Sequence, residues 1–337
     1  MRFLITGGYG FIGAWIARTL LADGAGVYLY DLREDPRRLR LILSEDEAGR
    51  CVFVPGDVTD GPRLTAAIRD HGITHVIHLA GLQVPTCRTN PLLGATVNVL
   101  GTLAVFEAVK ATGGQVNRVV YASSAAVFGS PDKYPAGPQP DAAPLIPSTH
   151  YGVFKVCNEG NARIYYQDHG ISSVGLRPWT VYGPGRDLGM TSDPTKAIKA
   201  TLLGRPFAIG FGGWTDFQYV ADVAQAFILS ATRPFTGAGA FNLRGDVVTL
   251  AEFHATLSRV LPAALDLVSI GTTQIAIAYD LSDDGITAAL GPLPKTSLEA
   301  GIRETVEVFT RLRAEGRLDA AELDAVQPLR VKAIDEV

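Results

Sequence analysis

A short apolar segment that runs directly into a glycine-rich turn opens the chain, and no other feature constrains the fold as strongly. Residues 3–6 have the composition of a buried strand, and Gly7, Gly10 and Gly13 follow as a helical pattern begins. Glycines so placed allow a tight turn, close approach of the backbone to a diphosphate, and close packing of a helix on a strand. The spacing is GxxGxxG instead of GxGxxG, and alone it also fits an ordinary turn. The glycine loop alone therefore does not establish a dinucleotide-binding fold, and further evidence must come from the rest of the sequence.

The first half of the chain alternates short apolar runs with longer segments of helical period. This alternation is typical of βα units around a parallel sheet, so we expect an α/β fold of the doubly wound, Rossmann type. A proline-rich stretch over residues 131–147 is expected to be a loop. The expected strands are residues 3–6, 26–30, 51–54, 75–79, 118–122 and 173–176, and the two clearest helices are residues 92–111 and 151–169.

After residue 177 glycines and prolines interrupt this alternation repeatedly, which predicts a second, smaller lobe. We expect residues 1–177 to form the dinucleotide-binding domain. Residues 178–315 are expected to form mainly a substrate-binding lobe, with a possible return of the chain to the first domain. The charged segment 316–337 is expected to be a peripheral tail. Because ligands of doubly wound sheets bind at the carboxyl ends of the strands, the chemistry should lie there.

Composition narrows the class of protein and its partners. The 337 residues are 47% hydrophobic and 19% charged, which excludes a largely disordered chain. The formal net charge is only −4, so no nucleic-acid partner is expected. Cys51, Cys87 and Cys157 have neither metal-ligand nor disulfide spacing, so we expect no metal. We find no signal peptide and no apolar run near about 20 residues, so we expect no membrane partner and a cytoplasmic location.

An acidic residue stands where the adenosine half of a dinucleotide would lie. Asp31 ends the second expected strand, at the interval beyond Gly13 at which dinucleotide folds place an acid. A carboxylate there accepts hydrogen bonds from the ribose hydroxyls and repels the extra phosphate of NADP, so NAD is favoured. Arg33 and Arg37 lie nearby and keep NADP open. Asp57, after the third strand, is a candidate acceptor for the adenine amino group.

A tyrosine and a lysine one helical turn apart form the candidate catalytic pair. Tyr151 and Lys155 share one face of the expected helix, where an ammonium group lowers the pKa of the phenol and holds the nicotinamide ribose. Ser124, at the end of the fifth strand, is placed to hydrogen-bond the reacting oxygen, and Ser123 to hold the carboxamide of the cofactor. His78, at the end of the fourth strand, is expected to be structural.

These residues belong to a longer series of motifs that occur in one order. The motifs are residues 6–13 (TGGYGFIG), 56–58, 78–81, 98–102, 123–129, 151–155 (YGVFK), 177–178, 181–186, 216–224 and 296–302. With them the sequence resembles the extended short-chain dehydrogenase/reductase family, the NAD-dependent epimerases and dehydratases, over roughly residues 1–312.

The resemblance implies NAD as cofactor, a catalytic triad and a small-molecule substrate seated against the second lobe. The triad is Ser124, Tyr151 and Lys155. The implied cofactor residues are Gly7, Gly10, Phe11, Ile12, Asp31, Leu32, Asp57, Val58, Leu79, Ala80, Gly81, Asn98, Ser123, Tyr151, Lys155 and Pro178. The implied substrate residues are Gln83, Ser124, Ala125, Tyr151, Thr180 and Thr215. The resemblance also implies a homodimer through helices 92–111 and 151–169, with Ala95, Val99, Ala104 and Val105 either in its seam or packed on the sheet.

Departures from the family pattern narrow the reaction. Ala125 and Ala126 follow the catalytic serine where dehydratases and decarboxylases carry acids, and alanine cannot transfer a proton. Thr215 stands where nucleotide-sugar epimerases usually have an arginine for the pyrophosphate, and residues 267–273 lack a second arginine. Candidate substitutes are Arg186, Lys196, Arg205 and Arg244. The polar and aromatic residues that suit a smaller polyhydroxylated substrate are Gln83, Trp179, Thr180, Thr191, Trp214 and Phe217.

The sequence therefore favours an NAD-dependent oxidoreductase that transfers a hydride at a secondary alcohol of a sugar, sugar acid or related small molecule. A UDP-sugar 4-epimerase that works through a transient ketone is the alternative. A non-catalytic NAD-sensing protein is a third hypothesis, against which the intact triad argues.

Overall fold

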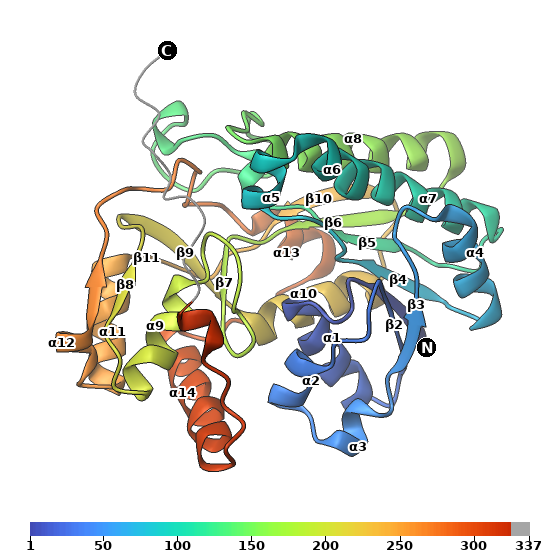
Figure 1. Cartoon of the computed structure of the whole chain (residues 1–337). Coiled ribbons are helices and arrows are strands. Elements are labelled where there is room, and N and C mark those ends of the chain that lie inside the picture. Colours follow the sequence, from blue (N-terminus) through green and yellow to red (C-terminus); the bar gives the residue numbers. More distant parts are fainter. Residues whose placement is uncertain (325–337) are drawn as a thin grey trace.

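A seven-stranded parallel sheet forms the centre of the computed structural model, which describes residues 1–324 (Figure 1). The strand order is β10-β6-β5-β4-β1-β2-β3, with the switch point between β1 and β4. This order is that of a doubly wound sheet and confirms the predicted fold class. The strands are β1 Arg2–Thr6, β2 Gly26–Asp31, β3 Val52–Pro55, β4 His75–His78, β5 Val119–Ala122, β6 Ser173–Arg177 and β10 Ala238–Asn242.

Helices cover both faces of the sheet, which is why its central strands are apolar throughout (Figure 1). Phe3, Leu4 and Ile5 of β1 are completely buried, and successive side chains enter the cores on opposite faces. The helices beside the sheet are α1 Phe11–Ala22, α2 Arg37–Ile42, α3 Glu45–Ala48, α4 Gly61–Asp70, α5 Val84–Thr89, α6 Pro91–Ala95, α7 Gly101–Ala111, α8 His150–His169 and α10 Val220–Thr232.

The six expected strands are all present, and one strand of the sheet was not expected. β10 pairs with β6 at the edge of the sheet, in register from Ala238 opposite Ser173 to Asn242 opposite Arg177. Its sequence, AGAFN, lacks the apolar run that marked the others. The chain beyond residue 177 thus returns to the first domain through α10 and β10.

The second lobe starts at the carboxyl edge of the large sheet, because β7 follows β6 after two residues. Its three-stranded sheet has the order β11-β9-β7, and a two-stranded sheet joins β12 to β8. Its strands are β7 Thr180–Tyr182, β8 Phe207–Ile209, β9 Trp214–Tyr219, β11 Asp246–Thr249 and β12 Val268–Ile270. The helices of this half are α9 Asp193–Leu202, α11 Leu250–Val260, α12 Ala264–Leu267, α13 Asp284–Leu290 and α14 Leu298–Ala314.

One long helical segment corrects an expectation. Pro91–Ala111 spans 21 residues with a mean hydropathy of 1.7, so by length and composition it reaches what a membrane-crossing helix needs. It consists of α6, a π-helical turn at Thr96–Leu100, and α7. Val105 and Phe106 lie in the core on one face of the sheet. Packing on the sheet accounts for the buried part of this segment, 44% of its most apolar window, and it places Val105 there instead of in a dimer seam.

Candidate active site

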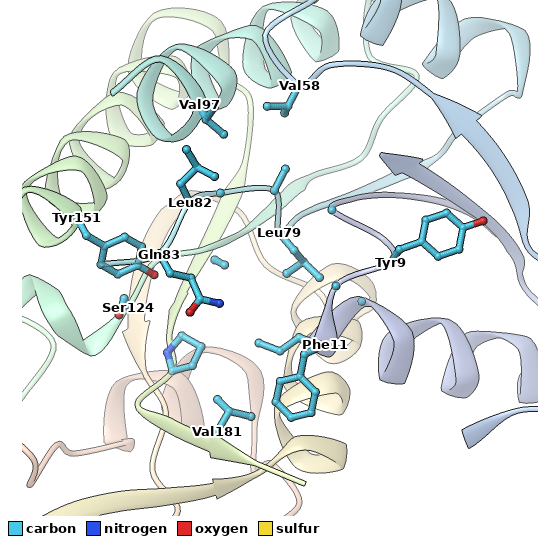
Figure 2. A pocket seen from close by; sticks show the side chains of 18 of the residues that line it. Tyr9, Phe11, Val58, Leu79, Leu82, Gln83, Val97, Ser124, Tyr151 and Val181 are labelled. Atoms are coloured by element: carbon cyan, nitrogen blue, oxygen red, sulfur yellow. The ribbon is translucent and has the colours of Figure 1, made fainter. Parts of the chain in front are cut away.

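A cavity of about 660 Å³ opens along the carboxyl ends of the parallel strands (Figure 2). Of the residues predicted to bind cofactor or substrate, it is lined by Gly7, Gly10, Phe11, Ile12, Asp31, Leu32, Asp57, Val58, Leu79, Ala80, Gly81, Gln83, Ser123, Ser124, Ala125, Tyr151, Lys155 and Pro178. Figure 2 shows Tyr151, Ser124 and Gln83 together on one side, with Tyr9 of the glycine loop on the opposite side. Distant segments of sequence therefore meet in one place.

The glycine loop has the geometry to hold a diphosphate. Gly7 has a φ of 67°, and a Cβ there would lie 2.8 Å from the backbone nitrogen of Ala80. A Cβ on Gly13 would lie 2.6 Å from the carbonyl oxygen of Gly8. No side chain caps α1, and its first intrahelical bond runs from Ala14 N–H to the Gly10 carbonyl. The N–H groups of Phe11, Ile12 and Gly13 are thus available to an anion at the positive end of the helix dipole.

Asp31 lines the end of the cavity that is predicted to hold the adenosine half of the cofactor. Its carboxylate accepts hydrogen bonds from the backbone N–H of Tyr9 at 3.2 Å and of Leu32 at 2.9 Å. Burial raises the pKa of Asp31, and the two backbone N–H groups oppose that rise. Of the two arginines that kept NADP open, Arg37 is engaged with Asp35 at 2.7 Å, and Arg33 lines the cavity.

The candidate catalytic pair, Tyr151 and Lys155, lies at the start of α8. Thr149 caps the helix by accepting a hydrogen bond from the backbone N–H of Gly152 at 3.0 Å. A Cβ on Gly152 would overlap the carbonyl oxygen of Ala126, so only glycine allows this close approach. The contact joins α8 to the short turn after Ser124, and the Ser124 side chain lowers the pKa of the Tyr151 phenol.

Lys155 lies one helical turn after Tyr151 in α8. Its Nζ donates a 2.6 Å hydrogen bond to the carbonyl oxygen of Ala122 and lies 5.5 Å from the centroid of the Tyr151 ring. Burial lowers the pKa of Lys155 to about 8. Two further ammonium donors remain for a ligand, because the lysine also lines the cavity.

The pKa of Tyr151 is set by different neighbours than the sequence suggested. Burial raises it, while the hydrogen bond from Ser124 and the positive charge of Arg186 lower it. From the sequence, Lys155 is expected to lower this pKa, and Arg186 is expected only as a candidate substitute ligand for a pyrophosphate. The sequence feature that could have indicated this influence is the position of Arg186 in the glycine-rich turn directly after β7.

Three predicted ligand-binding residues lie outside the cavity lining. Asn98 is buried, and its side-chain amide hydrogen-bonds both the N–H and the carbonyl of Leu82. It therefore fixes the backbone of a residue that lines the cavity. Thr180 and Thr215 are fully buried, with their hydroxyls 2.7 Å apart. Their hydrogen-bonding groups are turned toward each other.

Two polar residues at the strand ends form hydrogen bonds with neighbouring side chains. The ring nitrogens of His78 bond the hydroxyls of Thr6 at 2.7 Å and Thr102 at 3.0 Å, and burial lowers the pKa of this histidine to about 3. The prediction of a structural histidine is confirmed. Ser123, expected to hold the carboxamide, donates its hydroxyl to the carboxylate of Glu159 at 2.5 Å.

Comparison with known proteins agrees with this geometry. The model of the NAD dependent epimerase/dehydratase family matches residues 3–243. The chain belongs to this family. The chain is therefore an NAD-dependent enzyme of the epimerase/dehydratase type, as the sequence motifs predicted.

Individual relatives match over nearly the whole chain. It is 33% identical over 318 residues to a UDP-glucose 4-epimerase of Mycolicibacterium smegmatis, covering 92% of this chain and 98% of that protein. The crystal structure of the Thermus thermophilus UDP-glucose 4-epimerase in complex with NAD has a TM-score of 0.76 at 29% identity, covering 92% and 99% of the two chains. MoeE5 in complex with UDP-glucuronic acid and NAD has a TM-score of 0.75 at 28% identity, with the same coverage.

Proposed function

We propose that this enzyme is an NAD-dependent dehydrogenase that oxidises a secondary alcohol of a sugar, sugar acid or related small molecule. The observation that carries the proposal is the pairing of the Tyr151 and Ser124 hydroxyls within the cavity, opposite a second lobe in which Thr215 is buried against Thr180. The Tyr151 and Ser124 pair provides a base and a hydrogen-bond donor for the oxidation of an alcohol. The buried Thr215 and Thr180 pair argues against a charged clamp for a nucleotide diphosphate at this position.

The proposed reaction begins with a proton transfer to the Tyr151 oxygen. The substrate hydroxyl gives its proton to Tyr151, while the Ser124 hydroxyl orients the substrate oxygen by a hydrogen bond. Lys155, fixed by the Ala122 carbonyl, uses its free donors to hold the nicotinamide ribose. Bound NAD supplies the acceptor for the hydride that leaves the carbinol carbon, so that the alcohol becomes a ketone and the cofactor NADH.

Two of the four candidate substitutes for the missing pyrophosphate clamp are paired with carboxylates of the protein. Arg244 is paired with Asp280 at 2.6 Å, and Arg205 is paired with Asp324. Bidentate, charge-assisted contacts from arginine supply much of the affinity of a protein for a diphosphate, and an arginine that is already paired is not free to make them. Their engagement within the protein supports a substrate without one.

A spectrophotometric screen tests the proposal. Purified enzyme with NAD is assayed for NADH formation over free sugars, aldonates and uronates, with UDP-glucose and UDP-galactose as the comparison. We expect net NADH from at least one small substrate. Interconversion of the UDP-sugars without net NADH would reject the dehydrogenase and establish the epimerase.

The UDP-sugar 4-epimerase remains the second candidate because of one specific observation. The match to the Mycolicibacterium smegmatis enzyme covers 98% of that protein at 33% identity. In that reaction Tyr151 and Ser124 would keep their roles, and the hydride would return to the opposite face of the transient ketone. Product analysis by NMR separates the two reactions.

We also propose a cytoplasmic homodimer. Exposed apolar side chains gather on the outer surface of α6 to α8, namely Leu92, Leu93, Leu100, Val153 and Ile164. Such a patch favours burial against a second copy. The three cysteines are unpaired, which fits a reducing compartment. Leu100→Asp is expected to convert a dimer to monomers in analytical ultracentrifugation, and an unchanged mass would reject this interface.

A further inference from the structure

Charged side chains divide the cavity into two ends. The lining residues that follow β2 and β3, at the adenosine end, carry both signs: Asp31, Asp35 and Asp57 are acidic, and Arg33 and Arg38 are basic. Among the lining residues that the structure describes, the Tyr151 end carries only two charged side chains, Lys155 and Arg186. The end where chemistry occurs is therefore electropositive before any ligand binds.

Arg186 is an arginine with unused donors. Its Nη2 donates to the Thr191 hydroxyl at 3.1 Å, which is the only hydrogen bond of this side chain within residues 1–324. Its Nε is buried and has no partner. The neighbouring Asp187 does not neutralise it by contact, since that carboxylate binds Arg38 at 2.7 Å. A buried guanidinium N–H without an acceptor is costly, which suggests that a ligand supplies one.

Polar groups from both lobes converge beside this guanidinium. Gly189 has a φ of 103°, and a Cβ there would overlap the side-chain oxygen of Gln83 and lie 3.1 Å from Nη2 of Arg186. Figure 2 shows Gln83 next to Tyr151 and Ser124. The charge of Arg186 also acts on the Tyr151 hydroxyl. The loop after β7 thus delivers a positive, hydrogen-bonding group to the place where the substrate alcohol must lie.

We propose that Arg186, assisted by Gln83 and Thr191, binds an anionic group of the substrate, a carboxylate carried close to the carbinol that is oxidised. This rests on the proposed function and names its substrate class as a hydroxy acid of the aldonate or uronate type. The guanidinium matches a carboxylate by paired N–H donors, which sets both the affinity and the orientation of the carbinol toward Tyr151.

The cofactor diphosphate is the other anion that this arginine could meet. Two features favour the substrate. The N–H groups at the start of α1 have no side-chain cap and are available to a diphosphate without Arg186. Although Cζ of Arg186 lies 5.7 Å from the centroid of the Phe11 ring, its Nη2 is directed to Thr191 and Gly189. The experiment must separate the two sources.

Binding to the NADH-loaded enzyme is measured by calorimetry with matched acid and neutral ligands. The pairs are galactonate with galactitol, galacturonate with galactose, and UDP-glucuronate with UDP-glucose. We expect the acid of at least one pair to bind roughly 10- to 100-fold more tightly than its neutral partner, the range for a charge-assisted hydrogen bond. Arg186→Gln is expected to abolish this preference and Arg186→Lys to restore part of it.

Arg88→Gln is the matched control, because Arg88 is exposed on α5 and does not line the cavity. It is expected to keep the preference for the acid. The inference is overturned if no pair favours the acid, if the preference survives in Arg186→Gln, or if Arg186→Gln weakens NADH as much as it weakens the acid, since the anion would then be the diphosphate. NADH formation tests the dehydrogenase separately. Should the enzyme interconvert UDP-sugars, an Arg186-dependent preference for UDP-glucuronate would still support the anion site.

Discussion

Glu159 and Arg177 form a two-pronged ion pair beneath the active site, with Nε to Oε1 at 2.8 Å and Nη2 to Oε2 at 2.7 Å. Both side chains are almost fully buried, at 8% and 3% exposure. The pair joins α8 to β6, and Ser123 of the neighbouring strand end donates to the same carboxylate. Through this contact the helix that carries Tyr151 and Lys155 is fixed on the sheet.

Glu159→Gln is therefore expected to lower the free energy of unfolding by about 3–5 kcal/mol, because it leaves the Arg177 charge buried without its counter-charge. Urea denaturation followed by circular dichroism measures the change. Glu307→Gln, on the exposed face of α14, is the control and should stay within about 0.5 kcal/mol of the parent protein. Equal stability of the two variants would show that the ion pair contributes nothing net.

Tyr151→Phe removes the phenol oxygen that we propose as the acceptor of the substrate proton, and it leaves the glycine loop and Asp31 intact. We expect kcat to fall roughly 10²- to 10⁴-fold, the usual contribution of a general base, with the Kd of NAD nearly unchanged. NADH absorbance and fluorescence titration measure the two quantities. Tyr166→Phe, on the same helix and outside the cavity lining, should retain full activity. Unchanged turnover in Tyr151→Phe would remove the tyrosine from the mechanism.

Ser124→Ala should displace the pH profile of kcat/KM. Burial raises the pKa of Tyr151, and the hydrogen bond from Ser124 is the first influence that lowers it. Loss of that bond raises the pKa further, so the limb on which activity increases with pH should move to higher pH, and Ser124→Thr should move it back. A limb that stays in place while the rate falls would mean that Ser124 acts only on the substrate oxygen.

Asp31→Asn tests the adenosine end. The variant keeps the size of the side chain but loses the charge that binds ribose hydroxyls and repels a 2′-phosphate, so the Kd of NAD should increase by roughly 10- to 100-fold. The preference for NAD over NADP should decrease at the same time. Asp23→Asn, at the exposed end of α1, is the control. If Asp31→Asn leaves both affinities unchanged, cofactor choice depends on other groups.

The sequence predicted those parts of the fold and of the candidate site that are marked by neighbouring residues, and it did not predict the parts that depend on contacts between distant residues. The six strands of the first half and the Tyr151 helix were predicted because apolar runs and spacing are properties of neighbouring residues. β10 was missed because its residues, such as Gly239 and Ala240, are placed by pairing with the distant β6. The same limit applies to the site. Thr215 could be recognised as a departure from a motif, but only the fold shows that its hydroxyl meets Thr180. The effect of the Arg186 charge on the pKa of Tyr151 likewise depends on how the two lobes are placed in the fold.

Two glycines of α8 provide the sharpest test of how the fold sets the chemistry. A Cβ on Gly152 would overlap the Ala126 carbonyl oxygen, whereas a Cβ on Gly160 would meet no atom within 4 Å. Both lie inside the same helix, where alanine is favoured over glycine by about 1 kcal/mol. Gly160→Ala should therefore stabilise the protein by up to about 1 kcal/mol and leave kcat unchanged.

Gly152→Ala has the same intrinsic helix preference but must push α8 away from the turn that begins at Ser124. We expect it to destabilise the protein by about 1–3 kcal/mol, as overpacking does, and to lower kcat because the Tyr151 and Ser124 hydroxyls separate. Thermal unfolding and single-turnover NADH formation measure the two effects. If Gly152→Ala matches Gly160→Ala in both stability and rate, the close approach of α8 to the serine turn does not position the catalytic tyrosine.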